Sequence, residues 1–427
     1  MAVYDRELAK TVLWLAQKIE SSLPEGMPLD RGNEKTLEQI LRRFERARQH
    51  DSIKIRPEDE EHVFEMILNE IVGFGPLQHL LDDESVTEVM VNRADLTYVE
   101  RKGKLGVAEE IQFVNDAHVE RVINKIIKPL GRQVDAKSPL VDARLPDGSR
   151  VNAMIAPCAI DGPNITIRKF SKNPFSMQDL INFGSLTEDM ASFLEACVVA
   201  KLNIVVSGGT GSGKTTLLNV LSSFIPAEER IITIEDAAEL SLLQEHVVRL
   251  ETKKPIGPNS TEVSIRDLVR NSLRMRPERI VVGECRGGEA LDMLQAMNTG
   301  QDGSLTTIHA NTPRDTLSRL TTLVLMSGMS LPILVVMQQI AAAVDLIVQQ
   351  ARMRDGSRKI TNITEVAGLE GDTIILQDVF SFVEKPGEDG AVKGQFEASG
   401  RRPLCEARLK SYDITFPAKM FMPPSRL

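Results

Sequence analysis

Cysteine is scarce in this sequence, and its four copies are scattered over 427 residues. No two of them form a C-x-x-C pair, so we expect neither a zinc site nor a disulfide framework, and a reducing compartment fits. The four residues are Cys158, Cys197, Cys285 and Cys405.

Long apolar runs are also missing. The amino-terminal residues are charged and lack the apolar core of a secretory signal. The most apolar long segment, Leu331 to Val348, contains Gln338, Gln339 and Asp345 and has only about the minimal length of a bilayer span. We predict a buried helix there, within a helical region over residues 325–348. The protein is therefore expected to be soluble and cytoplasmic, and any link to a membrane is expected to run through a partner.

The chain has no excess of positive charge. It contains 51 Lys and Arg residues against 60 Asp and Glu residues, a formal net charge of −9. This balance argues against a general nucleic-acid binder, so no stable nucleic-acid binding is expected. The length exceeds that of one ordinary core, which predicts two or three domains.

A complete phosphate-binding pattern is present at Gly208-x-x-x-x-Gly213-Lys214-Thr215. An apolar run suited to a buried strand precedes it, and helical spacing follows it. Glycines let backbone N–H groups converge on phosphate oxygens, and the helix start adds partial positive charge. Lys214 should reach the β and γ phosphates, and the Thr215 hydroxyl should enter a Mg²⁺ shell. The predicted nucleotide-binding residues here, for ATP with Mg²⁺, are Gly208, Gly209, Thr210, Gly211, Ser212, Gly213, Lys214, Thr215 and Thr216.

Two further strand-like runs end in acidic residues. One leads into Glu235 and Asp236, and the other leads into Glu284. Because the carboxyl ends of parallel strands line the ligand crevice, these acids should lie near the phosphates. Glu284 can hold Mg²⁺ through water or accept a proton from the attacking water, so we favour Glu284 as general base with Glu235 as its support. The reverse order stays open, and Asp236 can instead be the N-cap of a following helix.

A third motif, at residues 299–311, joins a glycine-punctuated loop to a short strand that ends in His309. A lone histidine is usually structural. Its position after such a loop in a P-loop domain favours a hydrogen bond to the γ-phosphate, which would report the loss of that phosphate.

Together these motifs resemble the ATPase superfamily of type II and type IV secretion and type IV pili. Residues 208–215 look like its Walker A, residues 234–236 like its Asp box, residues 282–286 like its atypical Walker B, and residues 300–311 like its His box. Residues 140–150 and 343–349 look most like the CpaF/TadA branch, which powers tight-adherence (Flp) pilus assembly. The tetracysteine zinc insert and the A-I-R-N-L-I motif of other branches are missing from the sequence, which favours that branch.

The resemblance implies a homohexameric ATPase that hydrolyses ATP to ADP and phosphate. It also implies a polytopic inner-membrane platform protein as partner, and a cytoplasmic motor associated peripherally with that membrane. Small-domain arginines reach the nucleotide in the resembling family, which suggests Arg144 and Arg168, with Arg150 between them in sequence. Ion pairs with acids such as Asp142 and Asp147 are the alternative. Further arginine candidates are Arg270, Arg274 and Arg286.

The expected fold class is α/β. We predict a helical region over residues 1–75, a small α+β domain (PAS-like) over 77–169, a linker over 170–176 and a RecA-like P-loop ATPase domain over 177–427. In the last domain strands alternate with helices, which is typical of a parallel sheet. The predicted elements are helices over 5–20, 36–50, 58–72 and 115–129, strands over 88–92, 96–100, 150–155, 164–168, 360–366 and 373–380, a hairpin over 140–150 and a mobile loop over 384–394.

Three other functions remain open at this point. A type IV secretion ATPase moving protein or DNA has the same motifs. A nucleotide-gated scaffold with negligible turnover is disfavoured by the intact acids Glu235 and Glu284. A nucleic-acid motor is disfavoured by the acidic charge balance.

Overall fold

The computed structural model describes residues 6–50, 55–101, 103–170, 174–255, 261–385 and 392–423. It divides into two compact units, Met1–Ser171 and Lys172–Leu427. Of the predicted linker, residues 171–173 lie outside the described residues, as do residues 386–391 of the predicted loop. The predicted boundary between a helical region over residues 1–75 and a small α+β domain over residues 77–169 stays a prediction.

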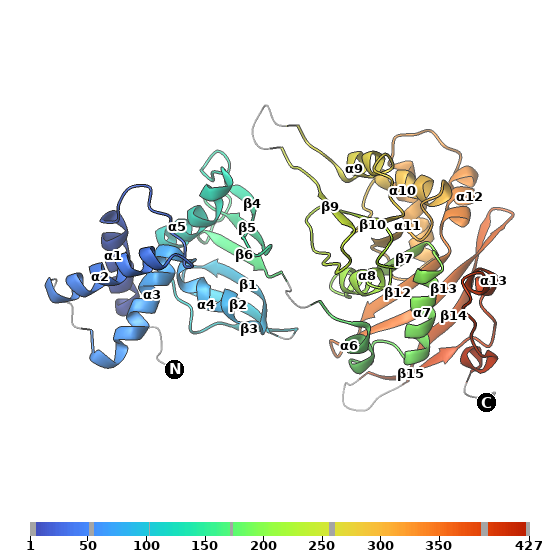
Figure 1. The fold of residues 1–427 in the computed structure, drawn as a ribbon, viewed down its shortest axis with the longest axis horizontal. Coiled ribbons are helices and arrows are strands. Elements are labelled where there is room, and N and C mark those ends of the chain that lie inside the picture. Colours follow the sequence, from blue (N-terminus) through green and yellow to red (C-terminus); the bar gives the residue numbers. More distant parts are fainter. Residues whose placement is uncertain are drawn as a thin grey trace. The chain divides into compact units, whose positions relative to one another are not determined.

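Three amphipathic helices begin the first unit (Figure 1). Apolar residues recur at helical spacing along each of them, and Leu15, Phe44 and Ile67 meet in one buried cluster. The predicted helices are confirmed to within two residues of their bounds. They are α1 Arg6–Ser21, α2 Glu34–His50 and α3 Glu60–Val72.

A six-stranded antiparallel sheet in the order β3-β2-β1-β6-β5-β4 completes this unit. Alternate residues of its strands, such as Val89 and Val91, are buried beneath α5 in a second apolar cluster. The predicted strands and hairpin are present, whereas β3 and the short helix α4 were not predicted. The elements are α4 Gln78–Asp82, β1 Val86–Arg93, β2 Leu96–Arg101, β3 Lys104–Val107, α5 Asp116–Ile127, β4 Leu140–Arg144, β5 Arg150–Met154 and β6 Asn164–Arg168.

Lys125 on α5 fixes the carboxyl end of α3. Its Nζ donates to the carbonyl of Ile71 at 2.9 Å, to that of Gly73 at 3.0 Å, and to that of Glu70. The last carbonyls of a helix have no partner inside the helix, so the ammonium group caps them. Burial lowers the pKa of Lys125 to about 8, which leaves it charged at neutral pH. This contact joins α3 to α5, which packs against the sheet.

The second unit is built on a nine-stranded mixed sheet in the order β15-β14-β13-β12-β7-β11-β10-β8-β9. The six strands from β12 to β9 in this order pair in parallel, and β12 to β15 pair antiparallel. The strands are β7 Ile204–Gly208, β8 Ile231–Glu235, β9 Val247–Glu251, β10 Arg279–Val282, β11 Leu305–Ile308, β12 Leu346–Arg352, β13 Arg358–Glu370, β14 Thr373–Lys385 and β15 Lys393–Ala398.

Helices cover both faces of this sheet (Figure 1). On β7, Ile204 and Val206 join the cluster formed with α7 and α8, whereas Val205 joins the cluster formed with α9 to α12. All three residues are buried, which explains why the strand reads as a continuous apolar run. The helices are α6 Met177–Asn182, α7 Glu188–Val199, α8 Lys214–Ser222, α9 Ile265–Ser272, α10 Glu289–Asn298, α11 Pro313–Leu325, α12 Ile333–Ala343 and α13 Glu406–Lys410.

The predicted buried helix over residues 331–348 is wrong in its last part. Helix α12 ends at Ala343, and β12 begins at Leu346. Asp345 accepts a hydrogen bond from the backbone N–H of Asn203 at 2.7 Å, and the N–H of Leu346 donates to the Asn203 carbonyl at 3.1 Å. These bonds end the helix and align β12 with β7. The strands that alternate with helices pair in parallel as predicted, and β13 to β15 extend the sheet with antiparallel pairing.

Across the described part of the chain, every helix is too short or too polar to traverse a bilayer.

Candidate nucleotide-binding and catalytic site

The predicted motifs gather at one edge of the sheet, where four neighbouring parallel strands end. β7, β11, β10 and β8 are adjacent in that order, and the register pairs Ser207 with Ile308, and Val282 with both Thr306 and Ile234. The P-loop follows β7, His309 follows β11, Glu284 follows β10 and Glu235 ends β8. The carboxyl edge of parallel strands is where ligands bind in such sheets.

Close contacts explain the glycines of the P-loop. A Cβ at Gly208 would stand 2.3 Å from the backbone oxygen of Gln350 on β12. Gly211 and Gly213 adopt positive φ values of 70° and 98°, which other residues rarely accept. A Cβ at Gly213 would also stand 3.2 Å from the Arg358 side chain. The loop therefore needs glycine both for its path and for the approach of β12 and β13.

The loop presents backbone donors that suit a phosphate group. The N–H groups of Gly211, Gly213, Lys214 and Thr215 donate to no other group of the described chain. They lie at the amino-terminal end of α8, where the helix dipole favours an anion. The Thr215 hydroxyl and the Glu284 carboxylate are oxygen donors of the kind that Mg²⁺ takes. The residues present thus fit a nucleotide phosphate with its metal.

Lys214, His309 and Glu284 form one hydrogen-bonded chain. The buried Lys214 Nζ donates to the Gly209 carbonyl at 2.9 Å and lies 3.4 Å from His309 Nδ1. The other ring nitrogen, His309 Nε2, is 3.0 Å from Glu284 Oε1. Three motifs that are far apart in the sequence therefore meet through side chains.

Donor and acceptor chemistry fixes the histidine tautomer. An ammonium group only donates, and a carboxylate only accepts. His309 must then accept at Nδ1 and donate from Nε2, which is the neutral ring. Burial and the Lys214 charge lower the pKa of His309, in agreement with this state. Burial also lowers the pKa of Lys214. The alternative of a histidine held in the core does not fit, because the His309 side chain is 41% exposed.

Glu235 differs from Glu284 in its surroundings. Its Oε2 accepts from the backbone N–H groups of Glu239 at 2.8 Å and Leu240 at 3.0 Å. Its Oε1 is buried and has no hydrogen-bond partner in the described chain. Burial raises the pKa of Glu235. Its Oε1 can therefore accept a further hydrogen bond while Oε2 holds the loop after β8.

Arg286 links two of the acids. Its guanidinium lies 2.5 Å from Glu284 Oε2 and 3.5 Å from Asp236 Oδ2. The residues between Asp236 and β9 are all described and form no helix, so the N-cap alternative for Asp236 is wrong. Arg270 likewise pairs with Asp292, at 2.8 Å. These two arginines have partners within their own unit.

Arg358 is a site residue that sequence reasoning missed. It lies at the start of β13, and its Nε donates to the Gly211 carbonyl at 3.1 Å across 147 positions of sequence. In a trans peptide the C=O and the next N–H point in opposite directions, so holding this carbonyl orients the following amide. No motif or periodicity marks such a distant contact in a single sequence.

A cavity of about 280 Å³ adjoins His309. It is lined on the α11 side by Asn311, Asp315 and Arg319, and the charge of Arg319 contributes to lowering the His309 pKa. No sequence motif marks Arg319.

Arg144 and Arg168 belong to the first unit. The strand register places Arg144 opposite Arg150, and Arg150 opposite Arg168, so the three lie in one row across β4, β5 and β6. Residues directly opposite in antiparallel strands share a face, which confirms the predicted placement on one face. Arg168 also lies 3.7 Å from Glu88. Their part in the nucleotide site stays a prediction.

The fold and the site define a class of protein. A P-loop between β7 and α8, with acids at the ends of neighbouring parallel strands, is a RecA-like nucleotide-binding arrangement. Within this class, the chain belongs to the type II/IV secretion system protein family, whose model matches residues 70–408.

Relatives with described roles include transfer and secretion proteins. The conjugal transfer protein TrbB of Rhizobium radiobacter is 35% identical over 294 residues, which cover 68% of this chain and 86% of TrbB. The type IV secretion system protein VirB11 of Bartonella quintana is 31% identical over 326 residues, covering 67% and 90%. An uncharacterized protein of Methanocaldococcus jannaschii is 47% identical over 243 residues, 55% of this chain, and the match spans only 34% of that protein.

Solved structures with partial likeness include the VirB11 ATPase of the Brucella suis type IV secretion system. It is 31% identical with a TM-score of 0.38, covering 67% of this chain and 94% of that one. The Legionella pneumophila ATPase DotB is 22% identical with a TM-score of 0.47, covering 68% and 78%.

The neutral state of His309 predicts an acid limb in the pH dependence of turnover. As the pH falls through the lowered pKa of His309, protonation replaces the Nδ1 acceptor with a donor that faces Lys214. We expect kcat for ATP to be flat above about pH 6.5 and to fall below it. His309→Gln should lose this limb and lower kcat by about 10–100-fold, the value of a hydrogen bond to a charged group. An acid limb unchanged in His309→Gln would contradict the assignment.

The Arg358 contact predicts a positioning effect on nucleotide binding. Arg358→Met should raise the KM for ATP about threefold to tenfold and leave kcat nearly unchanged, because it removes one net hydrogen bond to the loop. Arg354→Met is the matched control, since Arg354 lies in the turn that precedes β13 and pairs with Glu384 at 3.2 Å. Arg358→Lys should restore part of the affinity. Equal changes in the Arg358→Met and Arg354→Met variants would show that only the turn matters.

Proposed function

We propose that this chain is a homohexameric ATPase that hydrolyses ATP to ADP and phosphate. Its work would drive assembly of a tight-adherence (Flp) type IV pilus, or of a related secretion machine, through a polytopic inner-membrane platform protein. The observation that carries the proposal is the series of side-chain contacts from Lys214 through His309 to Glu284, beside the P-loop. The protein would be cytoplasmic and would reach the membrane through that partner.

Each residue takes a role from its surroundings. The free N–H groups of the P-loop and Lys214 would bind the phosphates, with Thr216 in the same helical turn. Thr215, and Glu284 through water, would hold Mg²⁺, which when bound neutralises charge that develops on the phosphate oxygens. Glu284 would accept a proton from the attacking water. At the same time the water oxygen would bond to the γ-phosphorus, and the bond between the γ-phosphorus and the bridging oxygen of ADP would break.

The same contacts support our order of the two acids. Glu284 is bound to His309, so the group that reads the γ-phosphate also touches the proposed base. Glu235 uses one oxygen to hold two backbone amides and keeps the other free. Its free oxygen is therefore suited to support a water molecule. Because burial also raises the pKa of Glu235, this residue is the alternative proton acceptor, and the two glutamine variants decide between the acids.

Type IV secretion of protein or DNA is the second candidate. Relatives named as conjugal transfer and type IV secretion proteins favour it. Replacing the wild-type chain by Lys214→Ala in its own cells would separate the two. Loss of surface pili with normal protein and DNA transfer supports the first function, and the opposite result supports the second.

Hydrolysis itself is tested by Glu284→Gln. Loss of charge and of proton acceptance should lower kcat by about 10²–10⁴-fold, while the dissociation constant for ATP changes little. Single-turnover assays of Glu284→Gln and Glu235→Gln, with the exposed Glu245→Gln as control, decide the order of the acids. If Glu235→Gln is far more severe, the two roles are reversed. Wild-type protein that binds ATP without measurable turnover would favour the nucleotide-gated scaffold.

The arginine row suggests a contribution from one subunit to another. The register places the three arginines in one row on one face of the sheet, where their side chains could contact one anionic group together. An arginine can be worth roughly 10³–10⁵-fold in phosphoryl transfer. Mixing inactive Lys214→Ala chains with inactive Arg144→Ala or Arg168→Ala chains should restore activity if the arginine crosses a subunit boundary. Arg93→Ala is the control, because Arg93 pairs with Asp95 at 2.5 Å. Normal activity of each arginine variant alone, with no rescue in mixed hexamers, would remove both residues from the site.

A further inference from the structure

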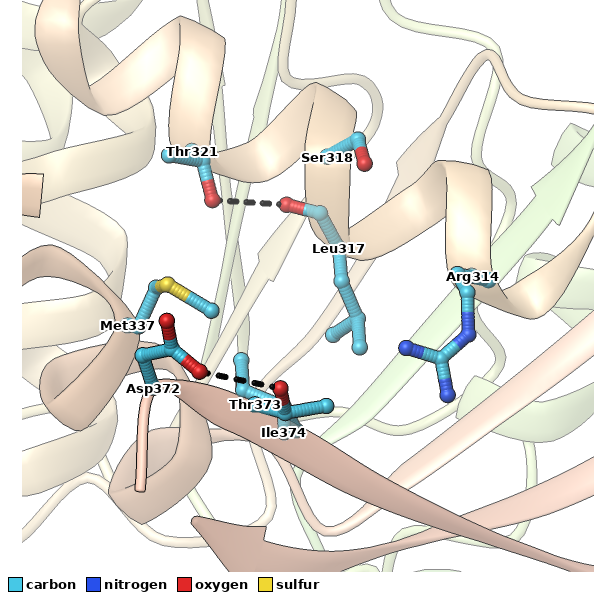
Figure 2. A pocket seen from close by; sticks show the side chains of 8 residues that line it. All are labelled: Arg314, Leu317, Ser318, Thr321, Met337, Asp372, Thr373 and Ile374. Atoms are coloured by element: carbon cyan, nitrogen blue, oxygen red, sulfur yellow. Dashed lines mark hydrogen bonds between the residues drawn. The ribbon is translucent and has the colours of Figure 1, made fainter. Parts of the chain in front are cut away.

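A pocket of about 350 Å³ lies between α11, α12 and the turn that joins β13 to β14 (Figure 2). Leu317, Met337 and Ile374 supply apolar groups, and Figure 2 shows Arg314 on one side of Leu317 with Asp372 on the other. The nucleotide site described above uses none of these residues. A pocket of this volume holds one or two side chains of a binding partner.

The apolar surface continues from the pocket along both helices. Leu325 lies one helical turn beyond Thr321, a lining residue of α11, and Ile333 lies one turn before Met337 of α12. Leu325 is 40% exposed, Ile333 59% and Leu334 45%. We call the pocket together with these three residues the α11–α12 surface. Contiguous exposed apolar groups beside a pocket mark a protein-binding surface more often than chance exposure.

The two charges of the pocket have no ion-pair partner in the described chain. Asp372 accepts one hydrogen bond, from the Thr373 hydroxyl at 3.2 Å, and Arg314 makes none. Opposite charges on either side of an apolar floor are complementary to a segment with the reverse order of charges. The charges therefore specify the orientation of a bound segment, and the floor supplies contact area.

We propose that the α11–α12 surface binds a segment of a partner protein that presents an apolar side chain between an acidic and a basic residue. The apolar side chain would fill the pocket over Leu317, the acid would pair with Arg314, and the base would pair with Asp372. The partner belongs to the machine named in the proposed function, and the proposal rests on that function only in requiring such a partner.

Helix α11 connects this surface to the nucleotide site. The Thr316 hydroxyl donates to the Ser207 hydroxyl at 2.7 Å. Both residues are buried, and Ser207 directly precedes the P-loop. Thr316 is the neighbour of Leu317, and the helix begins four residues after His309. A segment bound over Leu317 therefore contacts α11, the helix that is bonded to Ser207 through Thr316 and follows His309 in the sequence. Binding of this segment is expected to change the rate of ATP turnover.

Site-specific photocrosslinking tests the proposal in the full chain in its own cells. The photoreactive p-benzoylphenylalanine replaces Leu325, and replaces the exposed Glu228 in the control. We expect capture from the Leu325 position of a peptide from a different protein, with an acidic, an apolar and a basic residue in its sequence. Capture of a second copy of this chain, capture of a peptide without these charges, or no capture above the Glu228 control would overturn the proposal.

Charge reversal then tests the orientation. Arg314→Glu should lower the capture about threefold to tenfold and leave basal ATP hydrolysis unchanged, and changing the acidic residue of the captured segment to lysine should restore it. Arg401→Glu, an exposed position without an ion pair in the described chain, is the matched control. Capture that is insensitive to Arg314→Glu, or not restored by the second change, would refute the pairing. Crosslinking measures binding and does not depend on hydrolysis. A chain without ATPase activity would contradict the proposed function, and the crosslinking result would still decide whether the α11–α12 surface binds the segment.

Discussion

Parallel pairing of β7, β11, β10 and β8 is the constraint on which the site depends. Each strand contributes one motif, and the motifs meet only because all four strands end at the same edge. A shift of one residue in any pair would turn its side chains to the opposite face and separate the ends. The bond from Thr307 to the Gly283 carbonyl, at 2.8 Å, shows that side chains as well as backbone hold this register beside Glu284.

Within that frame, the order of side chains follows from their hydrogen-bonding inventory. The Gly209 carbonyl accepts from Lys214, Lys214 donates to His309, and His309 donates to Glu284, which also accepts from Arg286. Each link joins a donor to an acceptor, so the chain has one consistent proton arrangement with a neutral ring. The other tautomer would fit only if Lys214 lost its positive charge and Glu284 lost its negative charge together. The state of the site is therefore defined by the positions of its protons as well as by the conformation of its backbone.

Local patterns and chemistry were enough to predict the P-loop, the acidic strand ends and His309, together with the first three helices. Prediction failed where distant segments decide the structure. Residues 331–348 are mostly apolar, so periodicity could not separate α12 from β12, and the contacts of Asp345 with Asn203 make the division. Arg358 was not predicted as a site residue for the same reason, because its partner Gly211 is 147 positions away in the sequence. Long-range pairing leaves little trace in one sequence.

Helix α11 shows how packing converts local chemistry into a mechanical link. Thr312 caps the helix by accepting from the Asp315 N–H at 3.0 Å, which holds its first turn only three residues beyond His309. The buried bond from Thr316 to Ser207 then ties the second turn to the end of β7. A helix held at two neighbouring turns moves as a rigid body, since bending it would break backbone bonds. Under the proposed role of His309, a displacement of this residue on loss of the γ-phosphate would pass through Thr312 to α11, and so to Leu317 and Thr321 on that helix. A partner that binds α11 therefore contacts a rigid helix that is linked to the nucleotide site.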